Sequence, residues 1–106
     1  MKSARVPIFG CRLYFFDSVE DCAKYTEKNG WLVSHHGAAG ICARYGQEIV
    51  VAVNDPKNMG IIAHEAFHAA GEICRYAGIR SRDEELLAYL TEWVVNRAVT
   101  AFGAYI

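Results

Sequence analysis

The sequence has little of what marks a nucleic-acid-binding or membrane-spanning protein. Its 106 residues carry a net charge of −1 with histidine neutral, and the basic residues are scattered along the chain. The absence of a basic stripe argues against binding to nucleic acid. No uncharged apolar stretch approaches the roughly 20 residues that are needed to cross a bilayer. We therefore expect a protein that neither binds nucleic acid nor enters a membrane.

The N-terminal segment also lacks the parts of a signal peptide. Lys2 and Arg5 precede an apolar run, but Arg12 interrupts that run and no small-residue cleavage site follows it. Both features argue against a secretory signal. We therefore expect a soluble protein that acts where it is made, in the cytoplasm.

The cysteines form no CxxC pair, and they lie far apart in apolar or amphipathic segments. A free cysteine in such a segment packs as a small hydrophobic residue. A disulfide framework is expected only in a secreted chain. We therefore expect buried free thiols at Cys11, Cys22, Cys42 and Cys74.

What the sequence does contain is a hydrophobic fraction of 53%, which is too high for a disordered segment. The length suits a single domain over residues 1–106. Strands are predicted over residues 10–16, 31–34 and 40–54, the last as a hairpin that turns at Gly46 and Gln47. Helices are predicted from a cap at Asp17 to Asn29, from Asn58 to Ala77, and from Ser81 to about Ala101.

This order of elements predicts an α+β fold, in which helices pack on a small, mainly antiparallel sheet. The helix over residues 58–77 is apolar nearly all round, because Ala63 and Phe67 widen its main apolar stripe. Such a helix is expected to be buried on most sides.

That helix contains the sequence His64-Glu65-Ala66-Phe67-His68, which is an HExxH motif. Histidines four residues apart lie on one helical face, so their imidazoles can converge on a single zinc ion. Glu65 lies beside them, where it can act as the general base on a metal-bound water. In an apolar setting these polar groups need a partner, which a metal ion supplies. The competing interpretation is a pair of hydrogen-bonded core histidines.

A zinc site needs a third protein ligand, and the sequence offers several carboxylates. Glu72 is too far along the same helix to join both histidines, so it either orients His68 or is a solvated residue. On the next helix, Asp83 favours the N-terminus and Glu84 has capping-box spacing from Ser81. Glu85 has no such structural role, and it is the preferred ligand. Glu84 and Glu92 remain alternatives.

The pair HEAFH and EELLAY resembles the glutamate zincins, or gluzincins, in which a glutamate on a second helix completes the zinc site. Many members show Glu-x-x-Ala at that ligand, and Glu85 and Ala88 match it, 17 residues (68 to 85) after the motif. The chain also resembles small phage- or prophage-borne proteins of this type. The resemblance covers about residues 48–95.

The resemblance implies a minimal zincin-like domain that holds Zn²⁺ through His64, His68 and Glu85. It also implies that Glu65 deprotonates the zinc-bound water, which zinc acidifies. In larger relatives the strand before the motif lies at the sheet edge and pairs with an extended substrate. In this chain that strand would be residues 48–54.

The chain departs from larger relatives in having no room for a second lobe that walls the cleft. A transition-state donor is also hard to place: Tyr89 is the nearest choice, Tyr76 is a weaker one, and His35-His36 is a further possibility. The leading hypothesis is a zinc-dependent peptidase acting on a peptide or protein. The alternative is a zincin-fold binding or inhibitory protein, for example a phage-encoded one, that binds a host partner without proteolysis. A third interpretation is a structural protein whose motif is coincidental.

Overall fold

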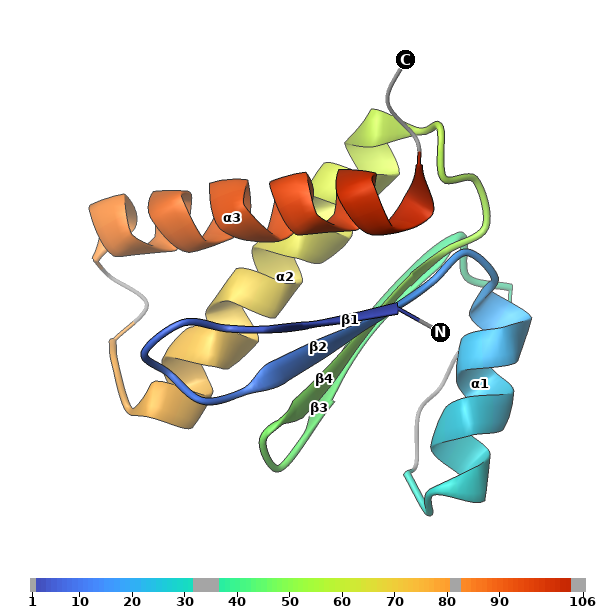
Figure 1. Ribbon diagram of the computed structural model, residues 1–106, viewed down its shortest axis with the longest axis horizontal. Coiled ribbons are helices and arrows are strands. Elements are labelled where there is room, and N and C mark those ends of the chain that lie inside the picture. Colours follow the sequence, from blue (N-terminus) through green and yellow to red (C-terminus); the bar gives the residue numbers. More distant parts are fainter. Residues whose placement is uncertain (1, 32–36, 81–82, 104–106) are drawn as a thin grey trace.

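A four-stranded mixed sheet and three helices form an α+β fold in the computed structural model, which describes residues 2–31, 37–80 and 83–103 (Figure 1). The strands are β1 (Lys2–Arg5), β2 (Arg12–Phe16), β3 (Gly40–Tyr45) and β4 (Glu48–Val53). The helices are α1 (Val19–Lys28), α2 (Met59–Ala77) and α3 (Glu84–Phe102). The α+β class and the predicted hairpin, with Gly46 at φ 63° in its turn, are thus confirmed.

The strand order in the sheet is β1-β2-β4-β3. Two neighbouring pairs are antiparallel, but β2 runs parallel to β4, with Leu13 opposite Ile49. The expectation that residues 48–54 form the edge strand is therefore wrong. Strand β4 is central because β2, from far earlier in the chain, covers its second edge, and β3 is the edge strand on that side.

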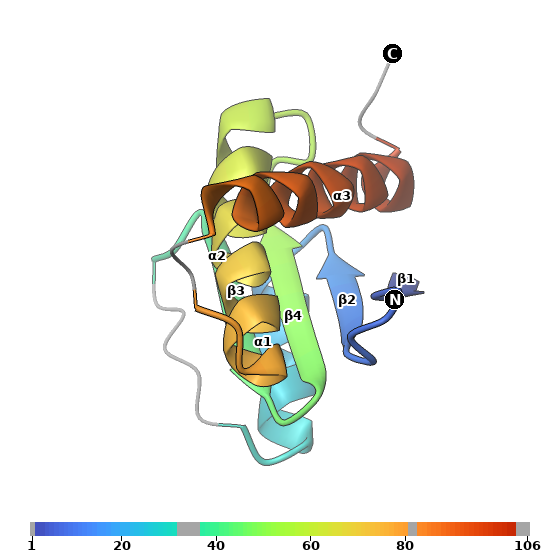
Figure 2. The same cartoon turned by 90° about the vertical axis from the view of Figure 1, so that its left-hand side faces the viewer.

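The helices cover opposite faces of the sheet, with α1 on one face and α2 and α3 on the other (Figures 1 and 2). Side chains of β4 alternate between the two cores. Ile49, Val51 and Val53 pack with α2 and α3, whereas Val50 and Ala52 pack on the side of α1. All five are fully buried, as expected for a strand that is covered on both faces.

Two helix starts differ from the sequence expectation. Ser18, rather than Asp17, caps α1, since its hydroxyl accepts a hydrogen bond from the backbone N–H of Asp21 at 3.1 Å. Helix α3 begins at Glu84, where the carboxylate of Asp83 accepts a hydrogen bond from the N–H of Leu86 at 3.0 Å. Each cap accepts a hydrogen bond from a backbone N–H that the first helical turn leaves without a partner. In both cases a polar residue one or two positions after the expected cap takes its place.

The bounds of α2 agree with the prediction. The side chain of Asn58 caps its start by accepting a hydrogen bond from the N–H of Ile61, and Gly78 ends it in the left-handed conformation with φ 73°. Glycine adopts that conformation without the steric cost that a Cβ atom adds. These two caps set both ends of α2, and the HExxH motif lies between them.

Other expectations had mixed outcomes. Trp31 is not in a strand, and residues 32–34 of the predicted strand lie outside the described residues. Strand β1, an exposed edge strand with Lys2, Ser3 and Arg5, was not predicted, because it shows no apolar alternation. All four cysteines are free, and all but the half-buried Cys42 are buried.

None of the helices in the described part of the chain has the length and apolar character to span a membrane.

Candidate metal centre

The two histidines of the HExxH motif lie on the side of α2 that faces away from the core. Ile62, Ala66 and Ala69 are fully buried between the sheet and α3, while His64 and His68 are exposed. The ring centroids of the two histidines are 4.8 Å apart, with the ring planes at 76°. Both imidazoles therefore project side by side from consecutive turns. The pair suits two of the ligand positions of a metal ion, because two helical histidines at this spacing can share one ion.

The expectation that α2 is buried on most sides is wrong on this face. Phe67 is 52% exposed, and Ala63 is exposed beside it. The imidazoles therefore do not need a metal ion to replace lost hydration, as they would in a core. The case for a metal rests instead on the convergence of the two rings and on the position of Glu65.

Glu65 is the buried member of the motif, with an exposed fraction of 6%. A Cβ atom built at Gly40 would lie 2.9 Å from Oε2 of Glu65 and 3.0 Å from its Cγ. The carboxyl group thus occupies space at β3 that a larger residue would fill. Burial raises the pKa of Glu65, and positive charge on His64 and His68 opposes that shift. A carboxylate with a raised pKa is a stronger proton acceptor.

The third ligand is not assembled in this arrangement. Among residues 2–31, 37–80 and 83–103, no three His, Cys, Asp or Glu side chains lie close enough together to hold a metal ion. Glu85, Glu84 and Glu92 are all exposed on α3. Glu85 as the third ligand therefore stays a prediction.

The reason for preferring Glu85 over Glu84 is weakened by the structure. Because Asp83 caps α3, Glu84 is the first residue of the helix and does not stand at the third position where a capping box needs its glutamate. Both glutamates are thus free of a capping role, and the choice between them is open again.

Glu72 has a different role from either one that the sequence suggested. Its Oε1 accepts a hydrogen bond from Nε of Arg44 at 3.1 Å, and its Oε2 lies 3.1 Å from Nη2 of Arg75. These contacts lower the pKa of Glu72, the hydrogen bond from Arg75 most of all. The carboxylate thus joins α2 to the edge strand β3, and it is not a partner of His68.

The tyrosines considered as transition-state donors are both on the surface. Tyr89 is 66% exposed, so its alternative role as a core tyrosine is wrong. The guanidinium of Arg44 lies 6.0 Å from the ring centroid of Tyr76. His35 and His36 lie outside the described residues. Tyr89 as a donor therefore stays a prediction.

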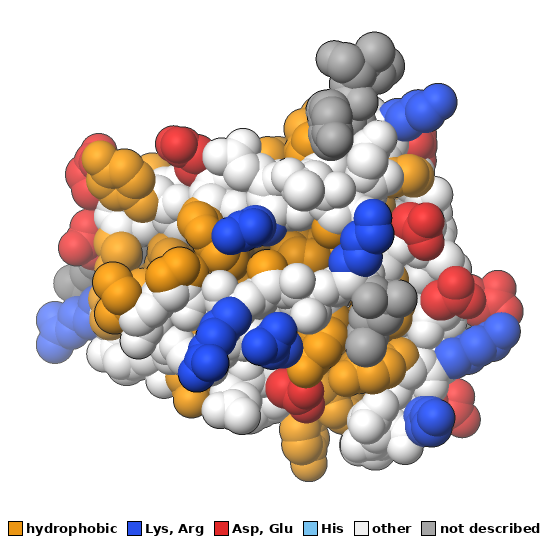
Figure 3. All heavy atoms as spheres, viewed as in Figure 1, with side chains coloured by type: hydrophobic (Ala, Val, Ile, Leu, Met, Phe, Trp, Pro, Cys, Tyr) orange, Lys and Arg blue, Asp and Glu red, His pale blue; other side chains and the backbone are white. Residues whose placement is uncertain are grey.

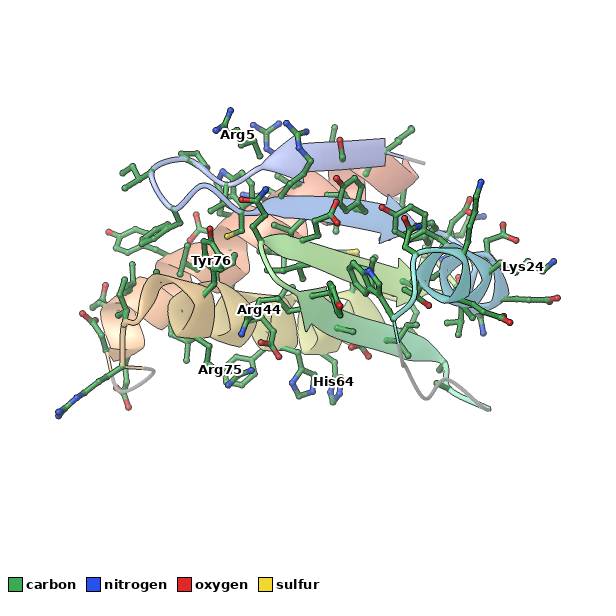
Figure 4. The ribbon with its side chains drawn as sticks, turned by 90° about the horizontal axis from the view of Figure 1, so that it is seen from below. Arg5, Lys24, Arg44, His64, Arg75 and Tyr76 are labelled. Atoms are coloured by element: carbon green, nitrogen blue, oxygen red, sulfur yellow. The ribbon has the colours of Figure 1, made fainter. Side chains whose placement is uncertain are left out.

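Sequence reasoning missed Arg44, Arg75 and Gly40. Figure 4 shows Arg44, Tyr76, Arg75 and His64 along the side where α2 and β3 meet. Arg44 and Glu72 are far apart in the sequence, so no local pattern could pair them. Arg75 follows Glu72 by three residues, which is a spacing that favours helical ion pairs and was the one available signal.

A pocket of about 200 Å³ lies beside the motif, lined by Phe67, His68, Gly71, Arg75 and Leu87. A larger hollow of about 370 Å³ lies between β1 and α3, on the face that Figure 3 shows, with Lys2, Phe15 and Arg97 among its lining residues. A larger pocket is usually preferred as a binding site. Of these two, the smaller one is the better choice, because it contains a motif histidine.

Comparison with known proteins identifies no family for the chain: no protein-family model, no curated protein and no solved structure matches it. The resemblance to the gluzincins therefore rests on the motif residues alone.

Proposed function

We propose that this protein is a zinc-dependent peptidase of the HExxH type. The observation that carries the proposal is the exposed pair His64 and His68 with the buried carboxyl group of Glu65 beside it. Solvent-facing imidazoles are accessible to an ion and to a substrate, as a catalytic site requires. A histidine pair that only packed in the core would not face solvent.

In this proposal His64 and His68 hold the ion, with Glu85 as the third ligand and Glu84 as its nearest alternative. Zinc supplies a bound water of lowered pKa and a Lewis acid for the scissile carbonyl. Glu65 accepts the proton of the attacking water and passes it to the leaving amine. Burial of Glu65, which raises its pKa, suits that proton transfer.

The edge strand β3 is the proposed docking strand for an extended peptide. It is the last strand of the described sheet, and its Gly40 contacts Glu65. A peptide that adds to this edge gains main-chain hydrogen bonds and runs past the motif. β3 thus takes the role of pairing with an extended substrate, which the resemblance had assigned to residues 48–54.

The test is peptide hydrolysis by the zinc-loaded protein, measured on a library of quenched fluorescent peptides. We expect Glu65→Gln to lower the rate by about a hundredfold or more while zinc content stays unchanged. Glu27→Gln, which neutralises an exposed carboxylate on α1, is the matched control and should leave the rate unchanged. A rate that survives Glu65→Gln would refute the assigned role of Glu65.

A second candidate function is binding without proteolysis, as in an inhibitor of a partner protein. It is favoured by the lack of an assembled third ligand among the described residues. In that case Glu65→Gln keeps partner binding, and no peptide of the library is cleaved by the wild-type protein. Hydrolysis that depends on both zinc and Glu65 would rule it out.

A further inference from the structure

The pocket beside His68 is built along one stripe of α2. Phe67, Gly71 and Arg75 follow one another at intervals of four residues, so they lie on one helical face, and Leu87 of α3 contributes a further part of the lining. Gly71 contributes no side chain, which leaves a hollow between Phe67 and Arg75. The pocket therefore has apolar side chains at Phe67 and Leu87, and a guanidinium group at Arg75.

Arg75 brings a positive charge to this pocket. Two guanidinium groups, Arg44 and Arg75, share the single carboxylate of Glu72, so this cluster of three residues carries an excess of one positive charge. Acidic side chains are also exposed at the start of α3, which contributes Leu87 to the lining: Asp83, Glu84 and Glu85. Arg75 contacts Glu72 through Nε and Nη2. A guanidinium has five N–H donors, so three of them on Arg75, including both at Nη1, are without an acceptor among residues 2–31, 37–80 and 83–103.

Arg75 is also accessible and held in place. Its side chain is 56% exposed, whereas that of Arg44 is 28% exposed. The contacts with Glu72 fix the plane of the guanidinium, and an ordered guanidinium loses less conformational entropy when it binds a carboxylate. In the part of the chain that the structure describes, Arg75 thus combines open N–H donors, the excess positive charge of its cluster with Arg44 and Glu72, and a restricted orientation.

The backbone of α2 does not require a glycine at position 71. Gly71 lies inside α2 and needs no positive φ, and glycine is a poorer helix former than alanine. A Cβ atom there would lie 3.4 Å from Nη2 and 3.7 Å from Nη1 of Arg75. Alanine would therefore fit without a clash, but its methyl group would fill the floor of the pocket next to the guanidinium.

We propose that this pocket binds an acidic side chain of a peptide ligand, with the carboxylate on the free N–H groups of Arg75 and the methylene groups between Phe67 and Leu87. The inference deepens the proposed function, on which it rests for the claim that the ligand is a substrate. The substrates are then peptides that carry Asp or Glu next to the residue that lies at His68. Binding itself needs only the pocket.

The test uses two blocked peptides, acetyl-Ala-Glu-Ala-amide and acetyl-Ala-Gln-Ala-amide, titrated into the isotope-labelled full chain. Chemical-shift changes at Gly71, Leu87 and the Arg75 Nε–H report on the pocket. We expect the glutamine peptide to bind about three- to tenfold more weakly, since it loses a charge-assisted hydrogen bond. We also expect the difference to shrink in high salt, which screens an exposed charge. Equal affinity of the two peptides would overturn the proposal.

Two variants separate a binding role from a structural one. Arg75→Gln should remove the preference for the glutamate peptide, whereas Arg97→Gln, the same charge change on α3 at the other hollow, should keep it. Gly71→Ala should raise the melting temperature by about 4 °C through helix propensity and still weaken binding of the glutamate peptide. A Gly71→Ala protein that binds this peptide as well as the wild type would contradict the proposal, even if Arg75→Gln does not fold.

The same titrations with chelator-treated and zinc-loaded protein distinguish this proposal from the proposed function. If the glutamate peptide binds preferentially but the protein takes up no zinc, the proposal for the Arg75 pocket stands and the peptidase function fails. If the protein binds zinc and shows no preference between the two peptides, only the proposal for the Arg75 pocket fails.

Discussion

The two sides of α2 differ in burial and in the kind of side chain that they carry. The inner side carries Ile62, Ala66 and Ile73, which are fully buried against the sheet and α3. The outer side carries His64, Phe67 and His68, all exposed. Small alanines on the inner side allow close packing, and the outer side leaves two imidazoles and a guanidinium facing solvent. One rigid helix thus holds polar groups in fixed positions without burying them.

Glu65 is the exception that connects the two sides. It follows His64 directly, yet it is buried near Gly40 of β3. A carboxyl group at this boundary is shielded from water, while the imidazoles of His64 and His68 are not. The comparison therefore predicts large stability effects on the inner side, intermediate ones at the boundary with β3, and small ones on the outer side.

The largest expected effect comes from the inner side. Ile73→Ala removes a fully buried side chain and should lower the free energy of unfolding by about 3 kcal/mol, because it leaves a cavity. Phe67→Ala, on the outer side, should lower it by less than about 1 kcal/mol. Urea denaturation of both variants checks the contrast. Equal losses would show that the two sides are not distinct.

At the boundary with β3, Gly40→Ala should lower the free energy of unfolding by about 2 kcal/mol through overpacking. The new Cβ atom would approach Oε2 of Glu65 to 2.9 Å and the carbonyl oxygen of Ala52 to 3.0 Å. Adding Glu65→Ala should restore part of the loss, since the close contacts with the side chain of Glu65 disappear and only the one with Ala52 remains. If the double variant is as unstable as the sum of the single ones, the carboxyl group of Glu65 does not lie against Gly40.

The ion pairs between α2 and β3 should make stability depend on pH. The pKa of Glu72 is lowered in the folded protein, so its stabilising effect is present above the unfolded pKa of about 4.5 and is lost as pH falls through the folded value. Glu72→Gln should therefore be less stable than wild type by about 1 kcal/mol at pH 7. The two should become equally stable in acid, as measured by urea denaturation across the pH range. A gap that persists in acid would assign the effect to packing.

The smallest effect on stability is expected at the histidines. His64→Ala and His68→Ala remove exposed side chains, so metal-free stability should change by no more than about 0.5 kcal/mol. Stabilisation by added zinc, seen as a raised melting temperature, should disappear in both. A large loss of stability without metal would instead indicate a structural role for the imidazoles.

Local signals predicted the parts of the fold that local chemistry determines. Asn58 and Gly78 bound α2 because a cap and a left-handed glycine act within one helical turn. The parallel pairing of β2 with β4 could not be predicted, since it joins segments separated by α1 and β3. That pairing also decides which strand is the edge, so the docking strand was misplaced.

The same limit applies to the candidate site. The HExxH spacing places both histidines on one helical face, and the structure agrees. The main apolar stripe read from the sequence is the side of α2 that faces the core. The sequence could not tell that Ala63 and Phe67, which widen this stripe, lie outside the core. The partners of Glu72 were missed since Arg44 comes from a separate strand. Contacts between distant segments decide both points.

The most direct test of the proposed metal centre is the zinc content per chain. It is measured by native mass spectrometry after the protein is loaded with zinc and excess metal is removed. We expect one zinc ion per wild-type chain and none in His64→Ala or His68→Ala, with weakened binding in Glu85→Ala. A wild-type chain that binds no zinc, or binds it equally well without either histidine, would contradict the central claim that the outer side of α2 is a metal centre.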